Sequence, residues 1–303
     1  MSTILYKRNK MILSIIPTKM RIGQAFKILR LDKHFSIKEV TAGEVSRSFI
    51  YKFEQGEYDI SVSKLLFLLN RIGVSFDELM ITANNYENYQ DSFFINLFLA
   101  IENKDQKKLV ELIKLNSRGT NLTQRLVYSL ASLFLETNHG SEKKDEAAFI
   151  FNYLTSVETW TRFELQVFNY VIPFITNDQR MLLVSKSKDC VLNYKYSLDD
   201  LYINYFSYIV VDITHFLLQK NDVAASHTVI SMVQEVQEVT TNERLTASFH
   251  FINALVHFYE DSSSEKINPI LSVINSVKQI NNDYAKQLEK IWDYHIKHLN
   301  LPG

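Results

Sequence analysis

Apolar residues recur three and four positions apart along almost the whole chain, with polar loops between the runs. This spacing places apolar side chains on one face of a helix. It predicts five short helices between residues 21 and 79, followed by five helix pairs and a terminal helix. The helices expected in this second part cover residues 86–102, 104–116, 121–138, 143–157, 161–175, 178–192, 197–219, 222–238, 242–260, 266–280 and 283–299. The pattern therefore predicts an all-α protein.

Residues that begin and end helices mark the boundaries in the first part of the chain. Ser36 and Glu39 form a capping box, in which a hydroxyl and a carboxylate accept the first free amides of a helix. Ser46 is expected to cap the next helix, and Gly56 to end it in the left-handed conformation. Gly43 interrupts the preceding run and is expected to mark a turn. Two further starts carry the same signals: Ser61, and the pair Ser75 and Glu78.

The helix expected over residues 47–55 has two unlike faces. Its core face is formed by Val45, Ile50 and Phe53. The opposite face carries four hydrogen-bonding side chains: Arg47, Ser48, Tyr51 and Lys52. A helix of this kind fits the major groove of DNA, where Arg and Lys donate to guanine and Ser reaches several base edges. A helix-turn-helix reader is therefore predicted, and an ordinary solvated helix face is the alternative.

The same residues carry a family resemblance. The phage-repressor (XRE) type of helix-turn-helix has a pattern similar to Ser36-Ile37-Lys38-Glu39-Val40, Val45-Ser46-Arg47-Ser48-Phe49-Ile50-Tyr51, Ile60-Ser61 and Leu79. The run Lys52-Phe53-Glu54-Gln55-Gly56-Glu57-Tyr58-Asp59-Ile60-Ser61 resembles the Rgg/GadR/MutR regulators of Gram-positive bacteria. The resemblance implies a five-helix, lambda-repressor-like DNA-binding domain over residues 20–81.

Charge adds candidates for contacts with the DNA backbone. The first 80 residues hold 13 Lys and Arg against 8 Asp and Glu, whereas the remainder holds 20 against 26. A basic end on an acidic body favours a polyanion as the partner of the first part. The candidates for phosphate contacts are Arg21, Lys27, Arg30 and Lys38. Taken singly, each of these cations is equally well explained as a surface residue.

The recurrence of helix pairs beyond residue 85 matches repeats of the tetratricopeptide sort, which bury their faces only by stacking on neighbours. Their consensus residues are absent, so the expected α-solenoid over residues 86–303 rests on spacing. The stretch Trp160-Thr161-Arg162-Phe163-Glu164-Leu165-Gln166-Val167-Phe168-Asn169 resembles a segment of the Rgg regulatory domain. With the first part, the resemblance then covers nearly all of the chain.

A stacked array forms a groove in which an extended peptide needs partners for its backbone amides. Asn suits this task because its side chain both donates and accepts. The candidates lie within expected helices among apolar residues: Asn96, Asn169, Asn204 and Asn253. Pocket walls are expected from Tyr128, Tyr170, Tyr205 and Tyr208, and a peptide carboxylate is expected to meet Arg125 or Arg162. The alternatives are interhelical hydrogen bonds for Asn, core packing for Tyr and surface ion pairs for Arg.

Composition excludes several other classes. Only 7 Gly and 4 Pro leave little material for the tight turns of a sheet protein, and the single Cys190 rules out an intrachain disulfide. The apolar stretches are shorter than a membrane span, so no transmembrane helix is expected. Residues 1–19 are interpreted as a disordered leader or a misassigned start. The eight His show no paired ligand spacing, and no phosphate loop or nucleophile motif is present. The sequence predicts no enzyme, metal or cofactor.

These patterns favour a cytoplasmic, homodimeric transcription factor that reads double-stranded DNA, because two-fold proteins match paired half-sites. The resemblance implies that the second domain senses a short imported signalling peptide, as in quorum sensing by a peptide pheromone. Two alternatives remain: an adaptor whose helical groove binds a partner protein, and a ligand-independent, constitutive regulator. Contact with RNA polymerase is left open. The dimer interface is expected in the C-terminal helix pair, with Ile291, Trp292 and Leu299.

Overall fold

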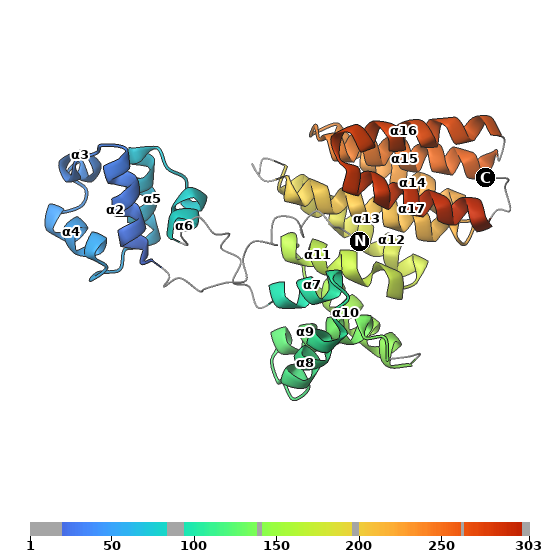
Figure 1. Cartoon of the computed structure of the whole chain (residues 1–303), viewed down its shortest axis with the longest axis horizontal. Helices are drawn as coiled ribbons and strands as arrows, with labels where there is room; N and C mark the ends of the chain where they lie inside the picture. Colours follow the sequence, from blue (N-terminus) through green and yellow to red (C-terminus); the bar gives the residue numbers. More distant parts are fainter. Residues whose placement is uncertain (1–19, 84–93, 138–140, 196–199, 262–263, 299–303) are drawn as a thin grey trace. The chain divides into compact units, whose positions relative to one another are not determined.

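A computed structural model describes residues 20–83, 94–137, 141–195, 200–261 and 264–298, and every regular element among them is a helix (Figure 1). The all-α prediction is confirmed. The chain divides into two compact units, one ending at Ile95 and one beginning at Asn96. The expected leader over residues 1–19 and the expected helix start at residue 86 lie outside the described residues.

Between residues 20 and 83, in the described part of the N-terminal unit, the structure has five helices, as predicted. They are α2 (Ile22–Asp32), α3 (Ile37–Thr41), α4 (Arg47–Gln55), α5 (Val62–Ile72) and α6 (Phe76–Ala83). The predicted caps are confirmed: the Ser36 hydroxyl accepts the amide of Glu39 at 3.3 Å, and the carboxylate of Glu39 accepts the amide of Ser36 at 2.7 Å. The amide of Phe49 donates to the Ser46 hydroxyl at 3.2 Å. Local sequence therefore fixes where these helices begin.

The turn between α3 and α4 requires the left-handed region. Ala42 has φ 40° and Gly43 has φ 88°, and α3 ends at Thr41 as the isolated glycine indicated. A second glycine, Gly23, allows two helices to pack closely, because a Cβ at this position would overlap the carbonyl oxygen of Phe53. Helices α2 and α4 approach each other too closely there for any side chain. The two glycines thus set the turn and the seating of α4.

A buried ion pair fastens α4 to α2. Arg30 and Glu54 are 5% and 3% exposed, and the Arg30 guanidinium donates to both Glu54 carboxylate oxygens, at 2.6 and 2.8 Å. Its Nη1 also donates to the carbonyl of Phe35 at 2.7 Å. Arg30 was expected to contact phosphate, and this expectation is wrong. Its guanidinium is instead enclosed between the helices, with every hydrogen bond directed inward.

The C-terminal unit is a succession of helices that pack against their neighbours in chain order. The helices are α7 (Ile95–Glu102), α8 (Gln106–Asn116), α9 (Leu122–Phe134), α10 (Ser141–Ser156), α11 (Arg162–Val171), α12 (Asn177–Asn193), α13 (Leu201–Leu218), α14 (Val223–Gln237), α15 (Glu243–Glu260), α16 (Ile267–Ile280) and α17 (Asn282–His298). Figure 1 shows α13 to α17 lying side by side. The stacking predicted from spacing is therefore observed.

Two expectations need correction. The helix predicted over residues 161–175 ends at Val171 and continues as a 3-10 turn, Ile172–Phe174, because Pro173 has no amide hydrogen to donate. Ile291 and Trp292, expected at a dimer interface, are 7% and 3% exposed. The Trp292 ring packs against Phe258, with ring centroids 5.1 Å apart, so this face of α17 belongs to the core. Leu299 lies outside the described residues.

Helix α13 is long and mostly apolar. By length and composition alone its residues Leu201–Leu218 would suffice to cross a membrane, which the sequence analysis did not expect. More than half of them are buried, and α13 packs against α11, α12, α14 and α15. Packing against these four helices therefore explains the hydrophobicity of α13.

Breaking the Arg30–Glu54 pair should destabilise α2 and α4. In Arg30→Ala the Glu54 carboxylate stays buried without a partner, at a cost of about 3–5 kcal/mol. The double variant Arg30→Met/Glu54→Met should recover most of that loss, because apolar side chains remove both charges from the interior. Hydrogen exchange of the α2 and α4 amides in the full chain measures both effects. Equal protection in Arg30→Ala and the wild type would contradict this role.

Candidate functional site

The outer face of α4 is the first candidate surface. Arg47, Ser48, Tyr51 and Lys52 are all exposed, as the sequence predicted, and Tyr51 is 57% exposed. Ile50 and Phe53 are buried on the opposite side. The structure thus presents two cations, a hydroxyl and a phenol together on one short helix, directly after the α3–α4 turn.

Lys52 is held in place by a residue that sequence reasoning missed. Its ammonium donates to the Tyr58 hydroxyl at 3.1 Å and lies 4.8 Å from the centroid of that ring. This hydrogen bond is the main reason that the pKa of Lys52 is raised, so its charge persists. Tyr58 packs in turn against Phe49, with centroids 5.9 Å apart. The sequence signal that could have identified Tyr58 is its position, because it is an aromatic residue just beyond Gly56, which ends the helix.

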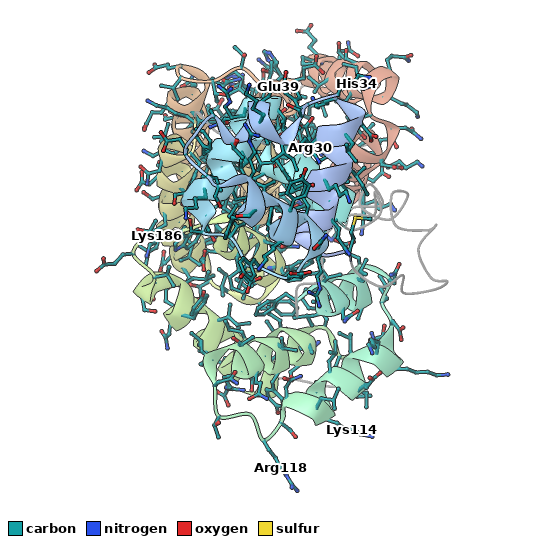
Figure 2. The ribbon with its side chains drawn as sticks, turned by 90° about the vertical axis from the view of Figure 1, so that its left-hand side faces the viewer. Arg30, His34, Glu39, Lys114, Arg118 and Lys186 are labelled. Carbon is teal, nitrogen blue, oxygen red and sulfur yellow. The ribbon has the colours of Figure 1, made fainter. Side chains whose placement is uncertain are left out.

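The cations expected at phosphates occupy different positions. Lys38 and Lys27 are exposed on α3 and α2. Arg21 is exposed too, and its guanidinium donates to the carbonyl of Gly56, where α4 ends. Figure 2 labels Arg30 and Glu39 on this unit; of the expected phosphate contacts, Arg30 is the one that is withdrawn from the surface.

The residues expected to bind peptide are distributed over α9, α11, α13 and α15. Asn169, Asn204, Asn253, Tyr128 and Tyr205 are half-buried, and Arg162 is exposed at the start of α11. Tyr170 is buried and stacks on Phe98 with centroids 5.1 Å apart, while its hydroxyl donates to Glu102 at 2.8 Å. Burial, and then the charge of Glu102, raise its pKa above the ordinary value. Tyr170 therefore matches the core-packing alternative.

Two further candidates, Arg125 and Asn169, have different outcomes. Arg125 pairs with Glu146 at 2.8 Å and its guanidinium lies 5.2 Å from the Tyr128 ring centroid, so Arg125 follows the ion-pair alternative. Asn169 is different, because its side-chain oxygen is buried and accepts no hydrogen bond from the residues that the structure describes. A buried acceptor without a donor carries a desolvation cost that a bound N–H group would remove.

One stripe of α13 carries several half-buried polar side chains. Asn204, Tyr208, Asp212, His215 and Gln219 follow each other at intervals of three and four residues, and all are half-buried. This spacing puts them on one face of the helix. Asn204 and Tyr208 are the two of these that the sequence analysis identified as candidates. The helical interval between polar residues in an otherwise apolar run was the signal for the others.

Near one end of the stripe, Arg244 of α15 contacts two tyrosines. Its guanidinium donates to the Tyr208 hydroxyl, and its central carbon is 4.9 Å from the ring centroids of both Tyr208 and Tyr284. Tyr284 of α17 is buried and shares a hydrogen bond with the Ser248 hydroxyl. Three helices therefore fix the position of this guanidinium.

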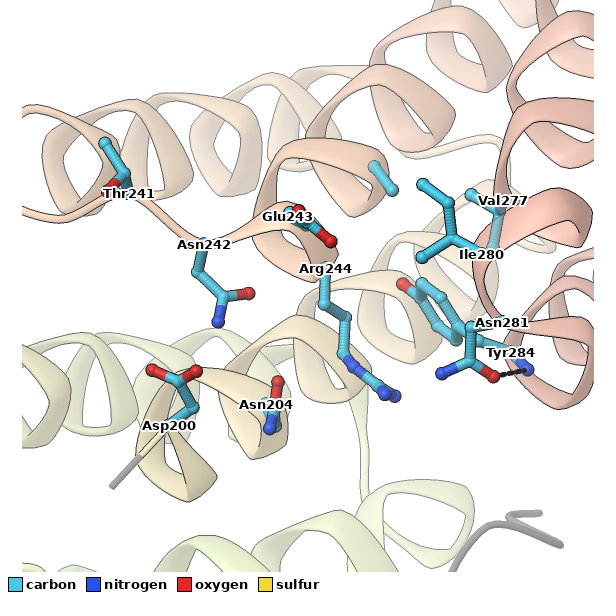
Figure 3. Close-up of a pocket in the computed structure, with 11 residues that line it drawn as sticks. Asp200, Asn204, Thr241, Asn242, Glu243, Arg244, Val277, Ile280, Asn281 and Tyr284 are labelled. Atoms are coloured by element: carbon cyan, nitrogen blue, oxygen red, sulfur yellow. Dashed lines mark hydrogen bonds between the residues drawn. The ribbon is translucent and has the colours of Figure 1, made fainter. Parts of the chain in front are cut away.

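Arg244 reaches into a cavity of about 380 Å³ (Figure 3). Its walls come from α13, α15, α16 and α17: Asp200, Asn204, Thr241, Asn242, Glu243, Arg244, Ala247, Val277, Ile280, Asn281 and Tyr284. A second hollow of about 680 Å³ shares Asn242, Val277 and Ile280 with it and extends along α15 to His250. Amide groups, one cation and apolar side chains thus meet in one concave region.

Further along the stripe, His215 links α13 to α17 and α15 through a chain of hydrogen bonds. Nδ1 of His215 lies 2.9 Å from Nε2 of His295, and Nδ1 of His295 lies 2.6 Å from the Tyr259 hydroxyl. Burial lowers the pKa of His215 to about 4 and that of His295 to about 3, so both imidazoles are neutral at physiological pH. His295 is therefore part of a hydrogen-bonded chain between helices.

Two family comparisons match this architecture. Residues 99–290 match the family model of the C-terminal domain of the HTH-type transcriptional regulator Rgg, and residues 26–79 match a helix-turn-helix model. The first match alone spans more than half of the chain.

Three solved structures have a similar fold. A proposed transcriptional regulator from Listeria monocytogenes EGD-e superimposes with a TM-score of 0.81 at 18% identity, over 94% of this chain and 100% of that one. The SHP pheromone receptor Rgg2 of Streptococcus dysgalactiae gives 0.73 at 20% identity, over 91% and 99%. PrgX in its complex with iCF10 gives 0.73 at 13% identity, over 94% and 99%. These likenesses confirm the predicted fold.

Asp212 should make stability depend on pH. Burial raises its pKa from the ordinary 3.8 to about 6, so the folded chain binds a proton that the unfolded chain releases. Stability should fall as the pH rises from about 4 to about 6, because the charged carboxylate is disfavoured in the fold. Asp212→Asn should be more stable than the wild type by on the order of 2 kcal/mol at about pH 8, and equally stable near pH 4.

Urea unfolding of both proteins at the two pH values measures this difference. Asp293→Asn is the matched control, because Asp293 is an exposed carboxylate on α17. A difference between Asp212→Asn and the wild type that is the same at both pH values would show that the carboxylate does not titrate as described.

Proposed function

Because the chain belongs to the Rgg family of helix-turn-helix transcriptional regulators, we propose that its C-terminal unit senses a short signalling peptide and thereby controls DNA binding or transcription. The chain is a DNA-binding transcriptional regulator, and its N-terminal unit is the helix-turn-helix domain. A regulator of this class works where the chromosome is, so we place it in the cytoplasm.

The proposed DNA-reading surface is the exposed face of α4. Arg47 and Lys52 supply donors for guanine, and Ser48 and Tyr51 supply hydroxyls for other base or phosphate oxygens. Arg21 and Lys38 lie exposed on the same unit and are proposed as phosphate contacts. Arg30 contributes indirectly, because its bond to Glu54 holds α4 on α2.

A homodimer follows from the size of this surface. One helix of two and a half turns reads only a few base pairs, whereas two copies related by two-fold symmetry read paired half-sites. The dimer is therefore proposed for the intact protein. The buried positions of Ile291 and Trp292 exclude them as its contact residues.

The observation that carries the peptide proposal is the unpartnered oxygen of Asn169. A side-chain oxygen that is buried without a donor favours a ligand N–H, and the backbone of an extended peptide supplies such groups. The solved relatives support the class of ligand, since one is a pheromone receptor and another is a complex with iCF10. Asn204, Asn253, Arg162, Tyr128 and Tyr205 remain proposed contacts of the same peptide.

Substitutions on α4 should separate base reading from charge neutralisation. Arg47→Ala should weaken binding to selected genomic fragments by about 1–3 kcal/mol and relax the preference at one base position. Lys38→Ala should weaken binding to all sequences alike and reduce the slope of affinity against salt, on logarithmic axes, by about 1. Sequencing the sheared genomic DNA that the protein retains at about 150 mM salt supplies the fragments and the preference.

Arg118→Ala is the control, since Arg118 is an exposed cation at the turn between α8 and α9 (Figure 2). Specific retention that survives in Arg47→Ala/Lys52→Ala would contradict the proposed surface. If the folded wild type retains no specific fragment, the role of a protein-binding adaptor is favoured instead.

Replacing Asn169 should affect ligand binding and stability in opposite directions. Asn169→Leu removes an acceptor that lacks a donor, so the ligand-free protein should gain about 1 kcal/mol or more in stability. Retention of short apolar peptides from a synthetic library should fall about tenfold or more. Ser129→Ala is the control, because it also removes a buried, unpartnered oxygen, on α9. A variant that is less stable and still retains the peptides would contradict the assignment.

A further inference from the structure

Arg244 is a half-buried cation without a carboxylate partner among the residues that the structure describes. One of its donors is used by the Tyr208 hydroxyl, and its central carbon lies 4.9 Å from the ring centroids of both Tyr208 and Tyr284, whose rings are nearly perpendicular to each other. The remaining donors of a guanidinium form a planar fork that matches a carboxylate. The hydrogen bond to Tyr208 and the contacts with both rings fix that fork before any ligand arrives.

Two asparagines add donors to the same cavity. The side-chain oxygen of Asn242 accepts the amide of Leu245 at 3.0 Å, and that of Asn281 accepts the amide of Tyr284 at 3.1 Å. Each oxygen is thus occupied as a helix cap, and the NH2 group is left as the unused part of each side chain. Neither NH2 group meets an acceptor within the described part of the chain. Figure 3 shows Asn242, Asn204 and Asn281 around the guanidinium.

The acidic residues of this cavity lie where water reaches them. Asp200 and Glu243 are exposed at the wall, and neither forms an ion pair with Arg244 in the described structure. Charges in water interact weakly with a partly buried group several ångströms away. Beside the donors, Val277, Ile280 and Tyr284 provide an apolar wall, and Ile280 is 74% exposed. The cavity therefore suits an anionic group attached to an apolar body.

We propose that this cavity binds a carboxylate of the signalling peptide, with Arg244 as the bidentate partner and Asn242 and Asn281 as neutral donors. The proposal rests on the peptide-sensing function above and adds the chemistry of one subsite. The carboxylate comes from the peptide's C-terminus or from an Asp or Glu side chain. Its ligands belong to α15, to Asn242 before it and to the α16–α17 turn, and Tyr208 links them to α13. Occupancy therefore ties these three helices together.

The test compares two synthetic libraries of short apolar peptides that differ only at the C-terminus, one as free acids and one as amides. The full chain is incubated with each library, and retained peptides are identified by mass spectrometry. Charge-assisted hydrogen bonds predict that the wild type retains free acids about tenfold more than amides. Arg244→Gln should lose this preference, and Arg118→Gln, with the same change of charge on an exposed residue, should keep it.

Each outcome decides between sources or against the proposal. Enrichment of Asp or Glu among retained amides, lost in Arg244→Gln, assigns the carboxylate to a side chain. Retention without a terminal or an acidic preference overturns the subsite and leaves peptide sensing intact. If neither library is retained, the peptide-sensing function itself fails. Because the comparison of libraries uses the wild type, it remains decisive even if Arg244→Gln is unstable.

Discussion

The C-terminal unit depends on how α13 is buried. Four helices pack around it, so nearly all of its circumference must be apolar, and what remains for polar groups is a narrow stripe. The members of that stripe take part in the contacts that matter: Asn204 lines the Arg244 cavity, Tyr208 holds Arg244, and His215 joins His295. Because a ligand group facing this stripe also meets α15 and α17, binding there would change how three helices pack. A site at the centre of the packing is suited to control the unit that contains it.

The N-terminal unit meets a different constraint, since α4, the proposed recognition helix, has nine residues and cannot hold itself in place. Its seating depends on close approach at Gly23, the rings of Phe26 and Phe53 at 5.9 Å, and the pair Arg30–Glu54. A bidentate, charge-assisted ion pair has a narrow range of geometries, so it fixes the angle of α4 more strictly than apolar packing alone. The exposed face is thereby presented in one orientation, which base reading requires.

The sequence predicted the helices well because their signals are local. Capping residues such as Ser36 and Thr161 act within one turn, and helical spacing needs only neighbouring residues. The site was predicted less completely, because its contacts join distant positions. Arg30 looks like any basic residue until Glu54 is beside it, and Arg244 gains its meaning from Tyr208 and Tyr284, which lie 36 and 40 residues away. Local patterns contain no information about these pairings.

The groups left without partners give the best evidence of what the fold is for. A protein selected for stability alone would gain by replacing three groups with apolar ones: the oxygen of Asn169, the half-buried charge of Asp212, and the guanidinium of Arg244, which has no carboxylate partner in the described part of the chain. The buried histidines show that the same unit does satisfy polar groups when both partners are its own. These three groups lie on α11, α13 and α15, and α13 packs against both of the other helices. Polar groups of this kind on adjacent helices support the proposal that a ligand binds there.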